Sequence, residues 1–341
     1  MRVTRDSLLR LARETAQERA YNQPDIIAIY LIGSLRQEEP FLGNSTDIDL
    51  VIVHEAPPAI AREIISLPAN IHLDILHRAR ADYSSPRQLR LHPLLGHELY
   101  DAMLIHERQP FFEFVQAGVR GGMEFHAPAT LCQRAFRLLS ESRKGWLELS
   151  DTPNWEAEEM NAWLETLTTA ANALMEMDGT RLTERRFLSD FSHHLAALDL
   201  QDLFPPFLEL LGAFSSLLDE VAAWIPNWET DFQRAAQSAM RTSDLHPARL
   251  SYYLNGMRHY LESGQPLFAL WPLLRTWTWA ALALPEEQRI HWNEFMHRLG
   301  WAEKREEQLS ALDRYLDRIQ EALETYAAQH GVNLDALPPL L

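Results

Sequence analysis

Short apolar runs in the first third of the chain predict strands. Residues 26–32 (IIAIYLI) form a continuous apolar run rich in β-branched side chains, which is typical of a buried strand. Residues 47–53 (DIDLVIV) alternate between polar and apolar positions and then become apolar, and residues 71–76 (IHLDIL) alternate again. Each of these two segments predicts a further strand, the first of them with one polar end.

Two other segments of the same region have apolar residues at helical spacing. Residues 1–20 place acidic side chains among apolar ones, which predicts an amphipathic helix and does not match the apolar core of a signal peptide. Residues 59–67 come after Pro57 and Pro58 and precede Pro68, which predicts a short helix. The expected order is therefore helix, strand, loop, strand, helix, strand.

From about residue 116 the strand pattern gives way to helices, which prolines open and glycines close. The expected helices start at Pro128, Pro153, Pro247 and Pro285, and the last three end at Gly179, Gly264 and Gly300. We therefore expect an α+β chain, with a mixed-sheet domain over residues 1–115 and an all-α helical-bundle domain over residues 116–341.

The last predicted helix, about residues 302–330, carries a heptad-type apolar seam. Its members are Leu309, Leu312, Leu316, Ile319, Leu323 and Tyr326. Packing inside the bundle explains this seam, and so does contact with a second copy in a homodimer. Earlier in the same region, Trp271, Trp277 and Trp279 stand among apolar residues, which favours a place in the bundle core over a stacking platform for a ligand.

Composition narrows the class of partner. The chain has 341 residues and a formal net charge of −17, which disfavours broad binding to nucleic acid or to an anionic membrane. The single cysteine, Cys132, excludes an intramolecular disulfide. No apolar run approaches the length of a membrane span, so we expect no membrane partner and a cytoplasmic location.

Candidate chemistry is concentrated between the first and third predicted strands. Gly33 and Ser34 come directly after the first strand, where a glycine lets backbone approach a ligand closely and a serine can cap a helix whose free N–H groups bind phosphate. An ordinary turn explains the same two residues. The acidic residues of the next two predicted strands decide between these alternatives.

Asp47 and Asp49 are two residues apart on a predicted strand, so both carboxylates project from one face. Such a pair is expensive to keep charged without a cation, and Mg²⁺ suits carboxylate ligands. Asp74 lies between apolar neighbours on the third strand and therefore points away from their side of the sheet. Three carboxylates on adjacent strands favour a two-metal site.

The combination resembles the DNA polymerase β-like nucleotidyltransferase superfamily. The matching residues are Ile32-Gly33-Ser34, then Gly43-x-Ser45-x-Asp47-Ile48-Asp49-Leu50, then Asp74. The resemblance implies that Asp47 and Asp49 hold two Mg²⁺ ions, that Asp74 completes the site nearer the acceptor, and that Gly33 and Ser34 contact the β- and γ-phosphates of ATP or another nucleoside triphosphate. It covers about the first quarter of the chain.

Further residues join this hypothesis less directly. The loop after Ser34 departs from the compact Gly-Ser-x-Ala-Arg-Gly form of many small members, and Arg36 is its candidate phosphate ligand. Related two-domain enzymes also use basic residues of the helical domain, which makes Lys144 a second candidate; an exposed helix face explains Lys144 as well. The candidates for a general base are Glu98, Glu107 and Glu124.

Three functions remain open at this point. The first is a metal-dependent transfer of a nucleoside monophosphate, AMP from ATP, onto a hydroxyl of a small-molecule acceptor that the helical domain binds, a layout that resembles aminoglycoside nucleotidyltransferases. The second is modification of a protein or an RNA, and the net charge of −17 argues against RNA. The third is a non-catalytic, antitoxin-like nucleotide-binding or regulatory member of the superfamily.

Overall fold

The computed structural model describes residues 3–152, 156–213, 215–301 and 304–337. The expected helix start at Pro153 lies outside these residues. The chain forms two compact units, Met1–Phe125 and His126–Leu341, and each is described by itself. The expected domain boundary, after residue 115, falls inside helix α4 (Phe112–Arg120), whose apolar face packs in the core of the first unit.

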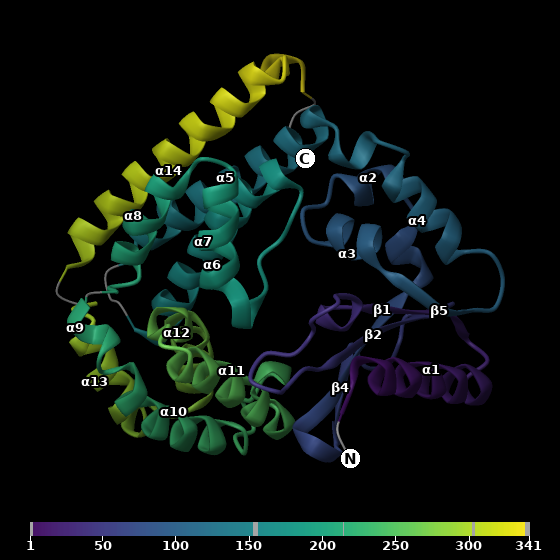
Figure 1. Cartoon of the computed structure of the whole chain (residues 1–341), viewed down its shortest axis with the longest axis horizontal. Helices are drawn as coiled ribbons and strands as arrows, with labels where there is room; N and C mark the ends of the chain where they lie inside the picture. Colours follow the sequence, from purple (N-terminus) through teal and green to yellow (C-terminus); the bar gives the residue numbers. More distant parts are fainter. Residues whose placement is uncertain (1–2, 153–155, 214, 302–303, 338–341) are drawn as a thin grey trace. The chain divides into compact units, whose positions relative to one another are not determined.

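A five-stranded mixed sheet forms the centre of the first unit (Figure 1). Its strand order is β3-β4-β2-β1-β5; β2 and β4 are parallel and the other neighbours are antiparallel. The strands are β1 (Ile26–Ile32), β2 (Ile48–His54), β3 (Arg62–Leu67), β4 (Ile71–Ala79) and β5 (Met103–Glu107). The three strands expected from the sequence are present.

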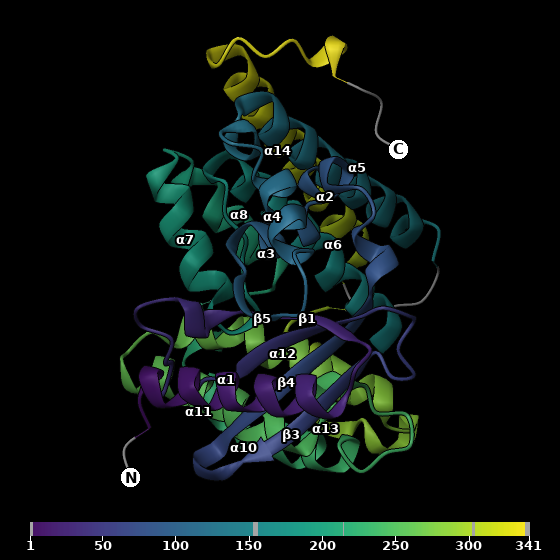
Figure 2. The ribbon, with the colours of Figure 1, turned by 90° about the vertical axis from the view of Figure 1, so that its right-hand side faces the viewer.

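Helices cover both faces of this sheet. Helix α1 (Arg5–Asn22) begins with a capping box between Thr4 and Ser7 and lies along one face (Figures 1 and 2). Helices α2 (Pro86–Arg90), α3 (Leu95–Asp101) and α4 lie on the other. Because strand side chains alternate, Tyr30, Val51 and Leu76 share this second face, which we call the α2–α4 face.

One predicted element is wrong. The spacing of residues 59–67 predicts a helix, and the structure has strand β3 over most of this segment. Strand β3 is at the edge of the sheet and half-buried, so its burial does not alternate clearly, and its backbone pairs with β4. The sequence pattern also does not predict strand β5, which is five residues long.

The second unit consists of helices in its described part. They are α5 (Pro128–Ser150), α6 (Ala157–Met175), α7 (Phe187–Ala197), α8 (Phe204–Leu210), α9 (Ser215–Leu218), α10 (Val221–Ala235), α11 (Leu250–Glu262), α12 (Pro266–Ala283), α13 (Ile290–Arg298) and α14 (Arg305–Gln329). Trp271 and Trp277 of α12 are fully buried, and Trp271 stacks on Phe187 at 3.8 Å between ring centroids. The core interpretation of these two tryptophans is confirmed, and so is the α+β fold class.

The apolar seam of α14 is used within the chain. Leu312, Leu316 and Ile319 are fully buried, and α14 packs against α5, where Trp146 Nε1 donates to the Leu309 carbonyl at 3.0 Å. The bundle interpretation therefore accounts for the seam.

Within the residues that the structure describes, no helix combines the length and apolar character needed to span a membrane.

Candidate active site at the end of strands β2 and β4

The Gly33-Ser34 turn stands where β1 ends. Gly33 has a φ of 74°, a conformation that favours glycine, and Ser34 starts the 3₁₀ helix η1 (Ser34–Arg36). Ser34 Oγ lies 2.9 Å from Thr46 Oγ1, which ties the turn to the segment that carries the aspartates. Arg5 of α1 donates to the carbonyls of Leu35 and Arg36, each at 3.1 Å, and fixes the turn from the other side.

The register of the central strands places two of the predicted carboxylates side by side. Asp49 of β2 is the direct neighbour of Asp74 in parallel strand β4, and of Ile32 in antiparallel strand β1. By strand alternation from Val51 and Leu76, both aspartates belong to the α2–α4 face. The Asp49 carboxylate lies against Gly33, since a Cβ on that glycine would come 1.9 Å from Asp49 Oδ2.

Asp47 lies just before β2 and is almost fully buried, with 5% of its surface exposed. Its Oδ2 is 3.9 Å from Nε2 of His72, a fully buried histidine of β4. The parallel register of β2 and β4 explains this proximity, because it pairs Ile48 with Leu73 and so brings the preceding residues of both strands together. The predicted trio therefore comes from neighbouring positions at one end of β2 and β4.

Asp74 also has a partner that sequence reasoning missed. Arg62 of β3 donates from Nε to Asp74 Oδ1 and from Nη2 to Asp74 Oδ2, both at 2.7 Å. The Asp74 side chain is 2% exposed and that of Arg62 is 28% exposed. This fork-shaped pair is the strong geometry for guanidinium and carboxylate. Recognition of residues 62–67 as a strand would have revealed Arg62. In a strand, positions 62 and 64 share one face, and Ile64 is the direct neighbour of Asp74.

The chemistry of these side chains suits Mg²⁺, although their arrangement is not that of a complete ligand set. Carboxylate oxygens are the ligands this ion prefers, and Asp49 lies directly against the glycine turn. Among the residues that the structure describes, no three His, Cys, Asp or Glu side chains converge closely enough to hold a metal ion. Both oxygens of Asp74 instead accept hydrogen bonds from the Arg62 guanidinium.

The three glutamates considered as general bases have structural partners. Glu98 of α3 accepts from Arg78 at 2.6 and 2.8 Å and from Tyr30 Oη at 2.8 Å. Glu107 accepts from two backbone N–H groups at the start of α4, and Glu124 forms an ion pair with Arg90. Each carboxylate is therefore accounted for by the fold of the first unit.

The network around Glu98 is polar but buried. Tyr30 Oη lies 2.8 Å from Tyr83 Oη, and Arg78 donates to Tyr30 Oη at 3.1 Å. Burial raises the pKa of Tyr83 to about 12 and that of Tyr30 well above its ordinary value. Both phenols therefore stay neutral at physiological pH and act as hydrogen-bonding groups within the α2–α4 face.

Two predicted phosphate ligands have other surroundings. Arg36 donates from Nη1 to the Asp101 carbonyl at 2.6 Å and pairs with the Asp101 carboxylate at 3.6 Å, so it joins the turn to the end of α3. Lys144 belongs to the second unit, is 76% exposed and pairs with Glu148 at 3.6 Å. The groove around Lys144 is lined by the glutamates Glu141, Glu148, Glu158, Glu159 and Glu165. Such a surface repels a triphosphate.

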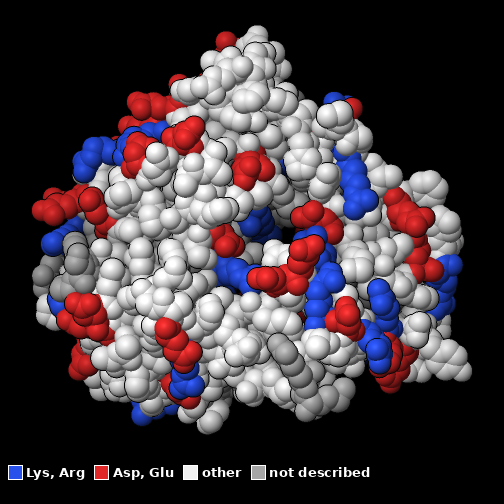
Figure 3. All heavy atoms as spheres, in the orientation of Figure 1, with Lys and Arg blue, Asp and Glu red and all other residues white. Residues whose placement is uncertain are grey.

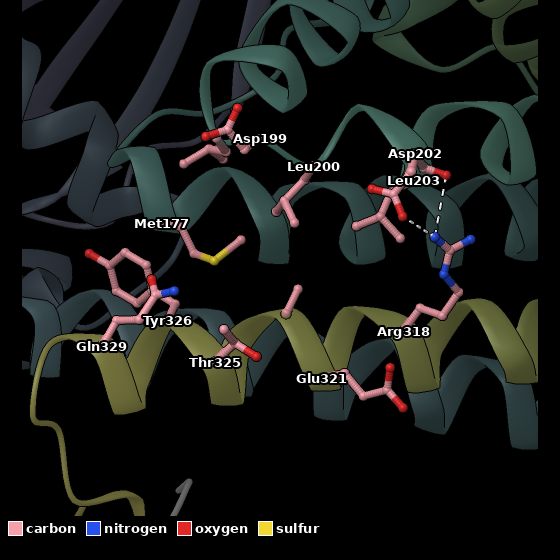
Figure 4. A pocket seen from close by; sticks show the side chains of 12 residues that line it. Met177, Asp199, Leu200, Asp202, Leu203, Arg318, Glu321, Thr325, Tyr326 and Gln329 are labelled. Carbon is pink, nitrogen blue, oxygen red and sulfur yellow. Dashed lines mark hydrogen bonds and ion pairs between the residues drawn. The ribbon is translucent and has the colours of Figure 1, made fainter.

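The second unit also contains a pocket of about 400 Å³ beside α14 (Figure 4). Met177, Leu200 and Leu203 supply its apolar wall, and Arg318 of α14 pairs with Asp202 across one end. On the face drawn in Figure 3, acidic side chains are interspersed with basic ones, and the chain as a whole has a net charge of −17. Neither feature favours a polyanion as the ligand.

Comparisons with known proteins add little to this geometry. No protein-family model matches the chain, and no curated protein matches it either. Among solved structures, the chain aligns with the crystal structure of a nucleotidyltransferase-like protein from Exiguobacterium sibiricum 255-15. The alignment has 14% identity, covers 95% of this chain and 92% of that chain, and has a TM-score of 0.30. A likeness at that score carries no argument about the fold or the function.

Proposed function

We propose that this protein is a magnesium-dependent nucleotidyltransferase that moves a nucleoside monophosphate, AMP from ATP, onto a hydroxyl group of a small-molecule acceptor. The observation that carries the proposal is the direct pairing of Asp49 and Asp74 on adjacent strands, with the Asp49 carboxylate against the Gly33 turn. Acidic groups on neighbouring strands next to a glycine-containing turn are suited to binding a cation together with phosphate.

Each residue of the site has its own task in this proposal. Gly33 allows a phosphate group to approach the backbone, and the Ser34 hydroxyl, positioned by Thr46, donates to a phosphate oxygen. Asp47 and Asp49 hold the cation, and Asp74 joins them on the acceptor side. When bound, Mg²⁺ neutralises triphosphate charge and lowers the pKa of the acceptor hydroxyl. The acceptor hydroxyl would release its proton to water, and its oxygen would bond to the α-phosphorus as the bond from that phosphorus to pyrophosphate breaks.

The small-molecule acceptor is favoured by charge. A protein with a net charge of −17 repels the RNA backbone, and the groove around Lys144 is acidic. We assign acceptor binding to the helical second unit, because the first unit supplies the phosphate turn and the carboxylates. Arg36 and Lys144 have no part in triphosphate binding in this proposal.

A non-catalytic regulatory module is the second candidate, and the Arg62–Asp74 ion pair favours it. A carboxylate whose two oxygens are both held by a guanidinium contributes little to a metal site. Modification of a protein or an RNA is the third candidate. All three make different predictions for the fate of the nucleotide.

A transfer assay separates these candidates. Purified protein is given Mg²⁺ and ATP labelled at the α-phosphate, together with a small-molecule extract, tRNA or protein in separate reactions. The proposal predicts label in the small-molecule pool, loss of this label without Mg²⁺, and normal labelling by the control variant Asp6→Asn, an exposed aspartate of α1. Label in tRNA or protein would instead identify modification of a macromolecule, and the absence of transfer to any pool would contradict the proposal.

A further inference from the structure

The Arg62–Asp74 pair joins a buried carboxylate of an inner strand to an arginine at the edge of the sheet. Asp74 belongs to β4, which has β2 on one side and β3 on the other, and its side chain is 2% exposed. Arg62 is the first residue of edge strand β3, where every residue is at least partly exposed, and its side chain is 28% exposed. An arginine at such a position can turn into solvent, whereas Asp74 cannot leave the sheet.

Charge explains why the guanidinium is there. Neighbouring strands are about 4.8 Å apart, so the paired residues Asp49 and Asp74 bring two negative charges close together. A buried carboxylate is stable when a positive group satisfies it. Arg62 satisfies both oxygens of Asp74, and it enters the α2–α4 face from the edge of the sheet. A divalent cation at the same carboxylates would supply the same compensation.

We propose that Arg62 is an internal counter-cation that competes with the divalent metal for Asp74, so that metal binding requires release of this ion pair. The inference rests on the proposed function, because it takes Asp74 to be a metal ligand. Arg62 is then a positioning residue: it acts through Asp74 and sets the metal concentration at which the site assembles.

A second fork-shaped pair on the same face shows what a purely structural role involves. Arg78 and Glu98 have side chains that are 20% and 12% exposed, and Tyr30 donates a further hydrogen bond to Glu98. Burial lowers the pKa of Arg78, but the hydrogen bonds to Glu98 raise it, and the pKa is higher overall than its ordinary value. Both members of this pair are less exposed than Arg62, which reaches Asp74 from the first position of an edge strand.

The test is metal binding by the variant Arg62→Met, which keeps the apolar stem and removes the charge. Titration calorimetry with Mn²⁺, and melting temperatures with and without Mn²⁺, are measured for the full chain. The control is Arg80→Met, because Arg80 pairs with the exposed Glu55 at 3.0 Å and the variant has the same net charge. The proposal predicts that Arg62→Met has a lower melting temperature than the wild type without Mn²⁺. Addition of Mn²⁺ should raise the melting temperature of this variant by more than that of the wild type. The variant should also bind Mn²⁺ roughly tenfold tighter. Arg80→Met should bind as the wild type does.

Each other outcome has a definite meaning. Equal or weaker Mn²⁺ binding by Arg62→Met, with normal binding by the wild type, overturns the competition and leaves the proposed function standing. Binding by neither protein, with or without ATP, overturns both. If Arg62→Met does not fold, Arg62→Lys replaces it, since lysine keeps the charge without the fork geometry. Mn²⁺ affinity of Arg62→Lys above that of the wild type supports the proposal, and unchanged affinity overturns it.

Discussion

The carboxylate of Asp49 occupies the space in which a side chain on residue 33 would begin. A Cβ built on Gly33 lies 1.9 Å from Asp49 Oδ2 and 2.9 Å from its Cγ, and the φ of Gly33 is 74°. Glycine is therefore required twice at this position, once by the backbone conformation and once by the aspartate. The turn and the strand carboxylate therefore pack against each other as one unit.

The first prediction concerns Gly33→Ala. The positive φ alone costs about 1–3 kcal/mol for a residue with a side chain, and the new methyl group must also push Asp49 aside. We expect a lower melting temperature and loss of nucleotide transfer. The control is Gly264→Ala, which has a φ of +72° and nothing within 4 Å of its Cβ. Transfer at the wild-type rate by Gly33→Ala would show that the contact with Asp49 is irrelevant to the chemistry.

The second prediction separates a structural carboxylate from a catalytic one. Glu98→Gln leaves the Arg78 guanidinium without its anionic partner inside the α2–α4 face. Since these side chains are 20% and 12% exposed, we expect a loss of roughly 2–3 kcal/mol of unfolding free energy, below that of a fully buried pair. Denaturant unfolding measures it. We expect the pH profile of transfer to keep its shape, and disappearance of one limb of that profile would instead identify Glu98 as the general base.

The third prediction concerns pH and a histidine on the α1 face of the sheet. Burial lowers the pKa of His77, while its hydrogen bond to Glu63 opposes this shift. As the pH falls below the ordinary pKa of 6.5, the unfolded chain takes up a proton before the folded one does. Stability must therefore fall with pH in this range, by at most about 1.4 kcal/mol per pH unit for one proton.

His77→Gln tests this linkage, because glutamine does not titrate. We expect a flatter dependence of unfolding free energy on pH between about 7 and 5, measured by urea unfolding, and an unchanged dependence in the control His193→Gln, an exposed position. Asp25 affects stability at a lower pH. Its hydrogen bond with His54 lowers its pKa, so the stability that this bond contributes is lost only as the pH falls through that lowered pKa. An equally steep profile in His77→Gln would assign the acid sensitivity to other groups.

The sequence predicts strands well where local pattern and burial agree. The run 26–32 is buried on both faces of a central strand, and β1 has the same bounds as the predicted strand. Residues 71–76 alternate because one face meets α1 and the other meets the carboxylate site. In both segments the side chains themselves carry the information about their surroundings.

The errors arise where pairing with a distant segment decides the structure. Residues 59–67 have helical spacing, yet the backbone of β3 pairs with β4, and Arg62 reaches Asp74 from there. The prediction of a helix for this segment therefore gave no reason to expect that ion pair, because a helical Arg62 would not lie beside strand β4. The same limit applies to Asp47 and His72, whose proximity comes from the parallel register and not from the spacing of either residue.

The central claim is that Asp49 binds the divalent cation that accompanies the nucleotide. Titration calorimetry of Mn²⁺ in the presence of a non-hydrolysable ATP analogue tests it without knowledge of the acceptor. We predict binding by the wild type and by Asp6→Asn, and at least about tenfold weaker binding by Asp49→Asn, with the melting temperature of Asp49→Asn preserved. Equal Mn²⁺ affinity in a folded Asp49→Asn protein would contradict the proposed site.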